Sequence, residues 1–356
     1  MADLEDKANK AAPGTISTIY DVSELAGVSA STVSRTFSRP EMISDATREK
    51  VFAAAKQLGY RPNTLAGSLT TKRTLLIGLL TTDIQNPFVA SLARGVQDGI
   101  ALKRYLSIIC STDGDAVREL DLLEEMLARG VDGFILTPPF DGPDPSVGAL
   151  LRDLPARGVP VVFIGHQNED SSSDFATSGA KNGEVEAVNH LISLGHSRIG
   201  FIGGYYTRGI GVGRWRGYRE ALQVHGLAPI PELELETDTT SESGSIAMNT
   251  LLNLSEPPTA VVTVNDLVAI GALDACREQG IEVPNQMSII GFDDILIASL
   301  VTPPLTTVAQ PAYELGRTAA KLILNRLHTP DLPAQQIVLG CKLIVRGTTA
   351  RCHTSE

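Results

Sequence analysis

The N-terminal region is organised by residues 19–35, which read IYDVSELAGVSASTVSR. Thr18 is a suitable N-cap for a first helix, and Asp21 places negative charge in its first turn. Gly27 can adopt a positive φ and is expected to end this helix. Because Ser29 can cap a second helix, the stretch predicts two short helices joined by a tight turn, which is a helix-turn-helix.

The second helix has two different faces. One face carries Val33 and Phe37, and the opposite face carries Ala30, Ser31, Ser34 and Arg35. In a helix-turn-helix the first residues of the second helix face base edges, where Arg can bond guanine and hydroxyls can bond a base or a phosphate. A third helix, capped by Ser44 and ended by Gly59, fits both this DNA-reading arrangement and a simple small helical bundle.

This region resembles the headpiece of the lactose/galactose repressor (LacI/GalR) family of bacterial transcriptional regulators. The matching strings are Tyr20-Asp21-Val22, Leu25-Ala26-Gly27-Val28-Ser29, Thr32-Val33-Ser34-Arg35, Thr47-Arg48, Leu58-Gly59-Tyr60 and Pro62-Asn63. The resemblance extends to about residue 347. It implies a homodimeric repressor that binds a near-palindromic double-stranded DNA operator and responds to a small-molecule effector. The residues expected at the DNA are Thr18, Tyr20, Ser29, Ala30, Ser31, Thr32, Ser34, Arg35, Asn63, Ala66 and Leu69.

Residues 63–73 follow as a candidate hinge. Asn63 can cap a helix there, but a helix this short is not stable alone. Leu65 and Leu69 lie four residues apart on one face, with little core to bury them. Either they pack on the head, or they form a wedge that enters the minor groove and kinks the duplex. The resemblance implies the wedge for Leu69, although Gly67 stands where many relatives carry Arg.

Net charge differs between the two ends of the chain. The 356 residues include 30 Lys/Arg and 41 Asp/Glu, a formal net charge of −11. Residues 16–73 hold eight of the basic and five of the acidic residues, and their net charge of +3 suits contact with phosphates. Residues 74–356 hold 20 basic and 33 acidic residues, and their net charge of −13 repels non-specific DNA.

Composition also limits the class of protein. The cysteines form no CxxC pair, which predicts no metal site and fits a reducing cytoplasm. They are Cys110, Cys276, Cys341 and Cys352. The N-terminus lacks the apolar run of a signal peptide, and no stretch is apolar and long enough to span a membrane. We therefore predict a cytoplasmic protein, with residues 1–17 as a disordered extension.

From residue 74 the sequence alternates apolar runs of strand length with amphipathic helical stretches. The expected strands are 75–80, 106–110, 133–136, 159–164, 198–203, 260–264, 288–292 and a last one near 337–345. This pattern predicts parallel sheets covered by helices. We thus expect an all-α helix-turn-helix headpiece (18–62) and an α/β, periplasmic-binding-protein-like core (74–347) of two doubly wound parallel-sheet lobes. The first lobe is expected at about 74–174 and 309–332, the second at about 175–306 and 333–347, and a tail at 348–356.

Doubly wound sheets bind ligands beyond the carboxyl ends of their strands, and a cleft between two lobes collects those ends. Polar side chains there can bond sugar hydroxyls, and a ring such as Trp215 or Phe88 can stack on a sugar face. The candidate effector-binding residues are Asp83, Phe88, His166, Arg214, Asn265, Asp293 and Gln310. The resemblance supports Arg214, Asp293 and Asn265. The alternative roles are a turn for Asp293, a surface ion pair for Arg214 and plain core for Trp215.

Two departures from the family pattern affect the expected effector. Gly165 stands where several sugar-binding relatives carry Asp, and Gly179-Ala180 stands where relatives usually read Asp-Asn. Both changes remove polar groups from the cleft side. His166 either replaces a lost group or is a buried structural histidine. The effector is therefore a less typical sugar or not a sugar, its identity stays open, and no cofactor is predicted.

Two other classes of protein fit parts of the sequence. Gly209-x-Gly211-x-Gly213 is similar to a dinucleotide-binding loop, but the third glycine of G-x-G-x-x-G would fall on Arg214. The sequence holds no Walker A loop, no G-x-S-x-G elbow and no H-E-x-x-H motif, so an enzyme is not predicted. A solute-binding protein would fit the core alone, but the headpiece argues against it.

Overall fold

The computed structural model describes residues 17–61, 73–137, 144–165, 173–204, 206, 209 and 211–352. Residues 1–16 and 62–72 hold most of the expected extension and hinge, and they lie outside the described residues. The chain divides between Thr74 and Leu75 into two compact units, which we call the head and the core.

The head packs its described helices around a small apolar centre. Its elements are α2 (Ile19–Ala26), α3 (Ala30–Ser38), the 3-10 helix η1 (Pro40–Met42) and α4 (Asp45–Gln57). Val22, Val33 and Val51 are fully buried, one from each α-helix. Gly27 and Gly59 have φ of 66° and 61° directly beyond α2 and α4, so the glycine stops predicted from the sequence are confirmed.

The first lobe of the core is a six-stranded parallel sheet in the order β11-β5-β4-β3-β1-β2. Its strands are β1 (Leu76–Thr81), β2 (Leu106–Ser111), β3 (Gly133–Leu136), β4 (Val161–Ile164), β5 (Asp174–Ser178) and β11 (Gln336–Leu339). Its helices are α6 (Pro87–Ala101), α7 (Ala116–Ala128), α8 (Pro145–Asp153), η2 (Leu154–Arg157) and α13 (Ala312–His328).

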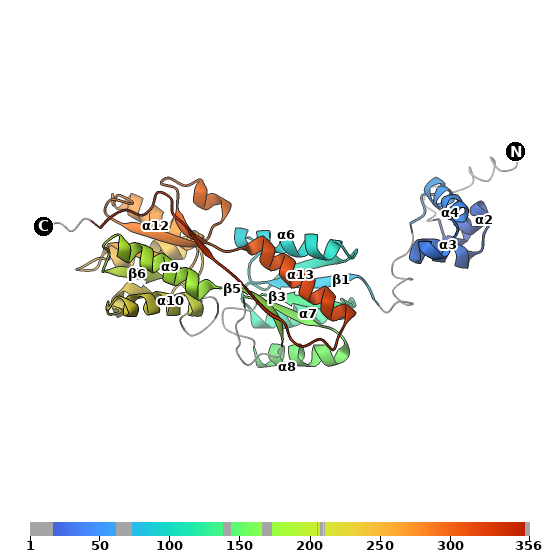
Figure 1. The fold of residues 1–356 in the computed structure, drawn as a ribbon, viewed down its shortest axis with the longest axis horizontal. Coiled ribbons are helices and arrows are strands. Elements are labelled where there is room, and N and C mark those ends of the chain that lie inside the picture. Colours follow the sequence, from blue (N-terminus) through green and yellow to red (C-terminus); the bar gives the residue numbers. More distant parts are fainter. Residues whose placement is uncertain are drawn as a thin grey trace. The chain divides into compact units, whose positions relative to one another are not determined.

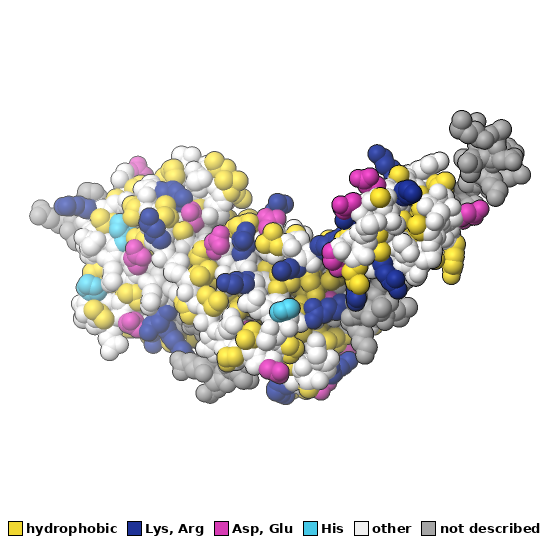
Figure 2. All heavy atoms as spheres, turned by 45° about the vertical axis from the view of Figure 1, so that its right-hand side comes forward, with side chains coloured by type: hydrophobic (Ala, Val, Ile, Leu, Met, Phe, Trp, Pro, Cys, Tyr) yellow, Lys and Arg dark blue, Asp and Glu magenta, His cyan; other side chains and the backbone are white. Residues whose placement is uncertain are grey.

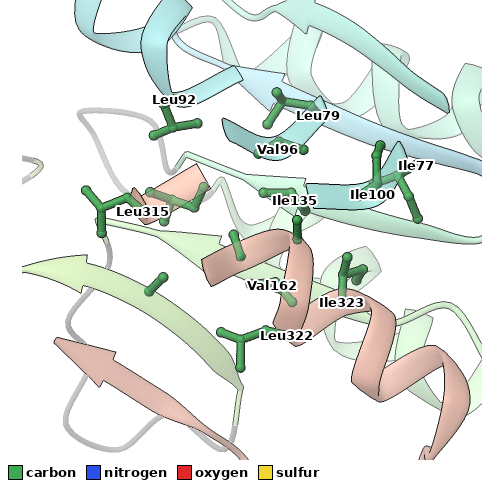
Figure 3. Close-up of a cluster of buried hydrophobic side chains, with 14 of the residues drawn as sticks. Ile77, Leu79, Leu92, Val96, Ile100, Ile135, Val162, Leu315, Leu322 and Ile323 are labelled. Atoms are coloured by element: carbon green, nitrogen blue, oxygen red, sulfur yellow. The ribbon is translucent and has the colours of Figure 1, made fainter. Parts of the chain in front are cut away.

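Helices cover both faces of this sheet, as its continuous apolar strands predict. Leu79 of β1 points towards α6 and α13, and Leu80, the next residue, points towards α7 and α8. Figure 3 shows the first of these clusters, in which Leu92 and Val96 of α6 meet Leu315 of α13 over the strands. Figure 1 shows α6 and α13 side by side in this layer.

The second lobe has a sheet in the order β12-β10-β9-β8-β6-β7, parallel except for the antiparallel pair β10 and β12. Its strands are β6 (Ile199–Ile202), β7 (Glu234–Leu235), β8 (Ala260–Thr263), β9 (Ser288–Asp293), β10 (Thr306–Ala309) and β12 (Lys342–Ile344). Its helices are α9 (Ala180–Ser193), α10 (Gly211–Val224), η3 (Pro231–Leu233), α11 (Ser241–Leu252), α12 (Asp266–Glu278) and η4 (Leu296–Ser299). α9 and α10 cover one face, and α11 and α12 cover the other.

The fold class predicted from the sequence is confirmed, but the lobe boundaries need correction. β5 pairs in parallel with β4 and β11, so residues 174–178 complete the first sheet instead of opening the second lobe. The last strand expected near 337–345 is two strands: β11 joins the first sheet, and β12 joins the second. The chain therefore crosses between lobes after β5, after β10 and after β11.

The described residues form neither a membrane span nor a metal-binding cluster. None of the helices in the described ranges combines the length and apolar character that a membrane span requires. Within the same ranges, no three His, Cys, Asp or Glu side chains gather as they would around a metal ion.

Candidate nucleic-acid interface and effector site

The first turn of α3 is a cluster of hydroxyls fixed by one cap. The Ser29 Oγ accepts from the Thr32 backbone N–H at 3.1 Å, and it lies 2.8 Å from the Ser31 Oγ and 2.9 Å from the Thr32 Oγ1. Ser31, Ser34 and Arg35 are exposed, whereas Ala30 and Thr32 are half-buried. The helix therefore presents a polar outer face with a single cation at its far end.

The inner face of α3 holds this outer face in place. Val33 and Thr36 are fully buried, and the Thr36 hydroxyl donates to the Thr32 carbonyl oxygen at 2.9 Å. The Phe37 ring lies 5.4 Å from that of Phe52 on α4. Since a helix buried on one side must turn the other side outward, the predicted division of α3 into two faces is confirmed.

The start of α2 adds two further candidates. Thr18 and Asp21 form a reciprocal capping box, in which the Thr18 Oγ1 donates to the Asp21 Oδ2 at 2.8 Å. These hydrogen bonds from Thr18 lower the pKa of Asp21. Tyr20, on the outer side of α2, is 72% exposed. On the face of the head visible in Figure 2, Lys and Arg side chains lie beside acidic and apolar ones.

Several candidates lie outside the described residues. They are the expected DNA contacts Asn63, Ala66 and Leu69 and the expected effector contact His166. The alternatives for the hinge leucines and for His166 therefore stay as the sequence leaves them.

In the core, three of the candidate effector residues meet in one buried chain of polar contacts. The Arg214 Nη2 donates to the Asp293 Oδ1 at 3.3 Å, and the Arg214 Nη1 donates to the Val264 carbonyl oxygen. The Gln310 amide donates to the same Asp293 oxygen at 2.5 Å and accepts from the Ser178 hydroxyl. We call Ser178, Gln310, Asp293 and Arg214 the buried polar chain.

The buried polar chain is unusual because its two charged residues are removed from solvent. Arg214 and Asp293 are only 4% and 7% exposed, and the Arg214 guanidinium stacks 4.1 Å from the centre of the Phe292 ring. Burial raises the pKa of Asp293 to about 6, against the opposing effects of Arg214 and Gln310. Arg214 is therefore not in the surface ion pair that was the alternative for it. Buried charge with a perturbed pKa beyond strand ends is typical of a ligand site.

At the end of β9 the backbone directs the side chains of the consecutive residues Asp293 and Asp294 to different partners. Asp293 and Asp294 have φ of 113° and 57°, which are rare values for residues other than glycine. Asp293 points into the buried polar chain, whereas the Asp294 Oδ1 accepts from the Arg346 Nη2 at 2.7 Å. Strain of this kind costs free energy and is concentrated at functional sites.

Asn265 lies at the end of β8 and is also buried. Its Oδ1 caps α12 by accepting from the Val268 N–H at 2.8 Å, and its Nδ2 donates to the Thr239 carbonyl oxygen at 2.9 Å. Both ends of the amide are therefore occupied within the second lobe. A role in binding would require Asn265 to share these bonds with the ligand.

The two candidates from the first lobe differ from each other. Asp83 is exposed, and its carboxylate accepts from the Gln85 N–H at 2.8 Å. Phe88 follows Asn86, the N-cap of α6, and packs against the apolar clusters of both lobes. A side chain in contact with both lobes is well placed to respond when their relative orientation changes.

Trp215 does not have a free ring. It stacks on Tyr206 with 5.0 Å between ring centres, and the Arg219 guanidinium lies 4.4 Å from its ring centre. Its Nε1 donates to the Glu234 Oε2 at 2.9 Å. These contacts match the alternative role of Trp215 as a core residue. Of the two rings proposed to stack on a ligand, Phe88 therefore remains the candidate.

Sequence reasoning missed two buried polar residues: Ser178, which belongs to the buried polar chain, and Glu184. A third buried polar residue, Asp266, follows Asn265 at a strand end that the sequence predicts. Burial and the neighbouring Asp293 raise the pKa of Asp266 to about 8, although Thr307 and the Ile295 N–H donate to its carboxylate. Glu184 occupies the apolar face of α9, three residues before Ala187 and seven before Leu191. That spacing was the available signal, because a charged residue in an apolar stripe points to a buried role.

The chain is similar to known proteins along most of its length. Residues 18–63 match a family described as bacterial regulatory proteins, lacI family, and residues 188–349 match a periplasmic binding protein-like domain. The ribose operon repressor of Escherichia coli (strain K12) is 36% identical over 333 residues, which cover 94% of this chain and all of that one.

Solved structures agree with the sequence relatives. The lac repressor dimer bound to operator and the anti-inducer ONPF has a TM-score of 0.84 at 29% identity, covering 94% of this chain and 100% of that chain. The complex of the transcriptional regulator CelR with cellobiose has a TM-score of 0.72 at 30% identity, covering 93% of this chain and 99% of that chain.

Proposed function

The chain belongs to the lacI family of bacterial regulatory proteins, and on that premise we propose that two copies act together on one near-palindromic operator. It is a DNA-binding transcriptional repressor with an effector-binding core. The finer proposal assigns DNA reading to the outer face of α3 and effector binding to the buried polar chain. The proposed protein acts by binding DNA and not by catalysis. Its proposed location is the cytoplasm.

The observation that carries the DNA half of the proposal is the geometry of α3. Its cap leaves the Ser31 hydroxyl and the Arg35 guanidinium on the exposed side, while Val33 anchors the opposite side. A hydroxyl near the start of a recognition helix and one Arg beyond it are groups that can bond base edges in the major groove. Thr18 and Tyr20, at the start of α2, are the proposed phosphate contacts.

Exposed apolar side chains support a homodimer through the core. Three of them lie on β2, just after α6 and at the start of α7 in the first lobe, and three lie on α11 and at η4 in the second; Val224 of α10 is a further exposed one. The six are Leu102 (74%), Leu106 (69%), Val117 (71%), Ile246 (62%), Leu296 (75%) and Leu300 (70%). Edge strands and exposed apolar side chains are common features of protein–protein interfaces. A head with a net charge of +3 also favours pairing, because one head meets few phosphates.

For the effector we propose a polyhydroxy compound. Arg214, Asp293 and Gln310 together offer donors and acceptors, which are the groups that recognise hydroxyls. Gly165 has φ of 80° and no side chain to contribute, so recognition on that side depends less on charge than in relatives with Asp there. A neutral sugar held mainly by the second lobe fits this balance.

Selection from random duplex DNA tests the proposal. Purified protein is expected to enrich one palindrome and to bind it far more tightly than scrambled DNA, with affinity falling steeply as salt rises. A matched protein lacking residues 1–73 should lose all operator binding. Enrichment of no sequence, with or without a metabolite extract, would contradict the operator proposal.

The selected operator then serves as the probe for the effector. Ribose and cellobiose are the first compounds to titrate, because relatives are named for or bound to them. A change in operator affinity would support the core as sensor, and its sign would separate an inducer from a co-repressor. The protein lacking residues 1–73 should still bind the same compound, since the core is a separate compact unit.

A further inference from the structure

Glu184 of α9 is a buried carboxyl that the proposed function does not use. Its side chain is 1% exposed, and its Oε1 has no hydrogen-bond partner in the described part of the chain. Burial raises the pKa of Glu184 to about 8, while the charge of Arg214 acts in the opposite direction. The carboxyl is therefore held mainly in its protonated, neutral form near pH 7.

Arg214 carries the matching unpaired group. Its Nη1 and Nη2 donate to Val264 and Asp293, but its Nε is buried and has no partner among the described residues. A guanidinium Nε–H is a strong donor, and leaving it unbonded inside a protein costs free energy. Glu184 and Arg214 thus form a buried acceptor and a buried donor that both lack partners.

Helix packing brings the two elements that carry these groups into direct contact. Arg214 and Gly217 lie three residues apart on one face of α10. A Cβ at Gly217 would lie 2.3 Å from the Lys181 carbonyl oxygen and 2.9 Å from the Glu184 Cβ, so this face of α10 packs directly on α9. Glycine at 217 is what allows Glu184 to sit between the helices.

The other ionisable groups around Glu184 are already engaged or neutral. On α10, the Tyr218 hydroxyl donates to the Ile199 carbonyl oxygen at 2.8 Å. On α9 itself, Lys181 forms an ion pair with Glu220 at 2.5 Å. Burial raises the pKa of Cys341, which touches α9 at Gly183, so its thiol stays neutral. Beyond Arg214 lies Asp293 of β9, the present partner of the guanidinium.

We propose that Glu184 is a reserve partner for Arg214, a positioning residue that takes the guanidinium when an effector engages the Asp293 carboxylate. The effector step rests on the proposed function. In the exchange, the Glu184 carboxyl loses its proton to solvent, and its oxygen accepts a hydrogen bond from the Arg214 Nε–H. The Asp293 oxygens then turn to the hydroxyl groups of the effector.

This exchange connects the effector site to the lobe crossings. Asp293 also accepts a hydrogen bond from Gln310, and Gln310 accepts one from Ser178. Ser178 ends β5 and Gln310 follows β10, so residues at two of the three crossings are hydrogen-bonded, directly or through one residue, to the carboxylate that the effector is proposed to bind. α9, which carries Glu184, begins directly after the first crossing. Transfer of Arg214 from β9 to α9 therefore changes the contacts of the segments that join the lobes.

The first experiment needs neither DNA nor effector. Asp293→Asn removes the competing negative charge and so imitates an engaged Asp293. The Glu184 carboxyl is followed by NMR in full-length protein with 13C-labelled Glu, with Glu184→Gln identifying its signal. Its proton affinity is expected to fall about tenfold or more in Asp293→Asn, a pKa shift of one unit or more. The same Glu184 titration in both proteins would overturn the proposal.

A second measurement covers failure of Asp293→Asn to fold. The 15N resonance of the Arg214 Nε is recorded in wild type from about pH 6 to about pH 9, the range in which Glu184 titrates. It is expected to move with the Glu184 titration, to lose that step in Glu184→Gln while any step from Asp293 or Asp266 remains, and to keep it in Glu119→Gln, a buried acid of the first lobe. Identical behaviour in wild type and Glu184→Gln would refute the pairing, while operator selection and effector titration would stand unaffected.

Discussion

The head and the core place polar groups in opposite ways. Among the described residues of the head, Thr36 is the buried polar side chain, and it is neutral and bonded to its own helix. The second lobe instead buries four ionisable side chains: Asp266 and Asp293 at or beyond strand ends, Arg214 near the start of α10 and Glu184 within α9. The proposed DNA contacts of the described head are thus mostly exposed, whereas the proposed effector contacts Arg214 and Asp293 are buried.

This difference teaches what each surface can do. Exposed hydroxyls and one exposed Arg are cheap to maintain and can be substituted without unfolding the head. Buried charges are costly unless each has a partner, so any ligand that takes one partner forces the others to rearrange. A reading surface thus has independent parts, whereas a sensing site has coupled ones.

The largest expected effect is that of Asp293→Ala in the core. It leaves Arg214 without its carboxylate, and we expect loss of the effector response and a fall of about 3 kcal/mol in the free energy of unfolding. Operator affinity without effector should stay at the wild-type value. Chemical denaturation and operator titration with and without effector measure these quantities. An unchanged effector titration would remove Asp293 from the site and break the contrast.

The next effect concerns Arg35→Ala in the head. We expect specific operator binding to weaken by about 1–3 kcal/mol and preference at one base pair to relax, because one base contact is lost. The melting temperature should not change, since Arg35 is exposed. Ser38→Ala, exposed at the end of the same helix, is the matched control. A head that unfolds on loss of Arg35 would show that its surface is not independent of its core.

The smallest effect is a pH dependence of opposite sign in the two regions. Burial raises the pKa of Glu119 from 4.5 to about 7. A raised folded-state pKa means that the stabilisation is fully present below about pH 4.5 and is lost as the pH rises through about 7. Wild type should therefore lose on the order of 1 kcal/mol of stability relative to Glu119→Gln between about pH 5 and pH 8.

The head should respond in the other direction. The pKa of Asp21 is lowered by its bonds to Thr18, so its contribution is present above the unfolded pKa and is lost as the pH falls. Thermal unfolding of wild type, Glu119→Gln and Asp21→Asn across pH resolves both trends. Parallel profiles for wild type and Glu119→Gln would show that Glu119 is not held neutral by burial.

The sequence predicted the head well because its signals are local. Thr18, Ser29 and Ser44 cap helices within three residues of themselves, and Gly27 and Gly59 end them. Most of the alternation of strands and helices in the core was also readable, but strands β5 and β7 were not among the expected ones. The assignment of β5 and β11 to the first sheet was not, because it depends on which strands pair across a gap of about 160 residues.

The candidate site was predictable only in part for the same reason. Arg214, Asp293 and Gln310 follow strands or open a helix, and the structure brings them together. Ser178 joins them through its hydrogen bond to Gln310, which is 132 residues away in the sequence. No local sequence pattern predicts that contact. Glu184 depends on Gly217, a pairing that exists only once α9 and α10 have packed.

The three crossings between lobes also determine the order in which the protein can be completed at the ribosome. β11 and β12 follow every other described strand in the sequence, and each finishes an outer edge of a different sheet. The first sheet is therefore incomplete until residue 339 has been made, and the second until residue 344. The helices of the head need only residues 17–61, which precede the core and interact locally. During translation a nascent chain can thus display a finished DNA-reading surface long before it has a finished sensor.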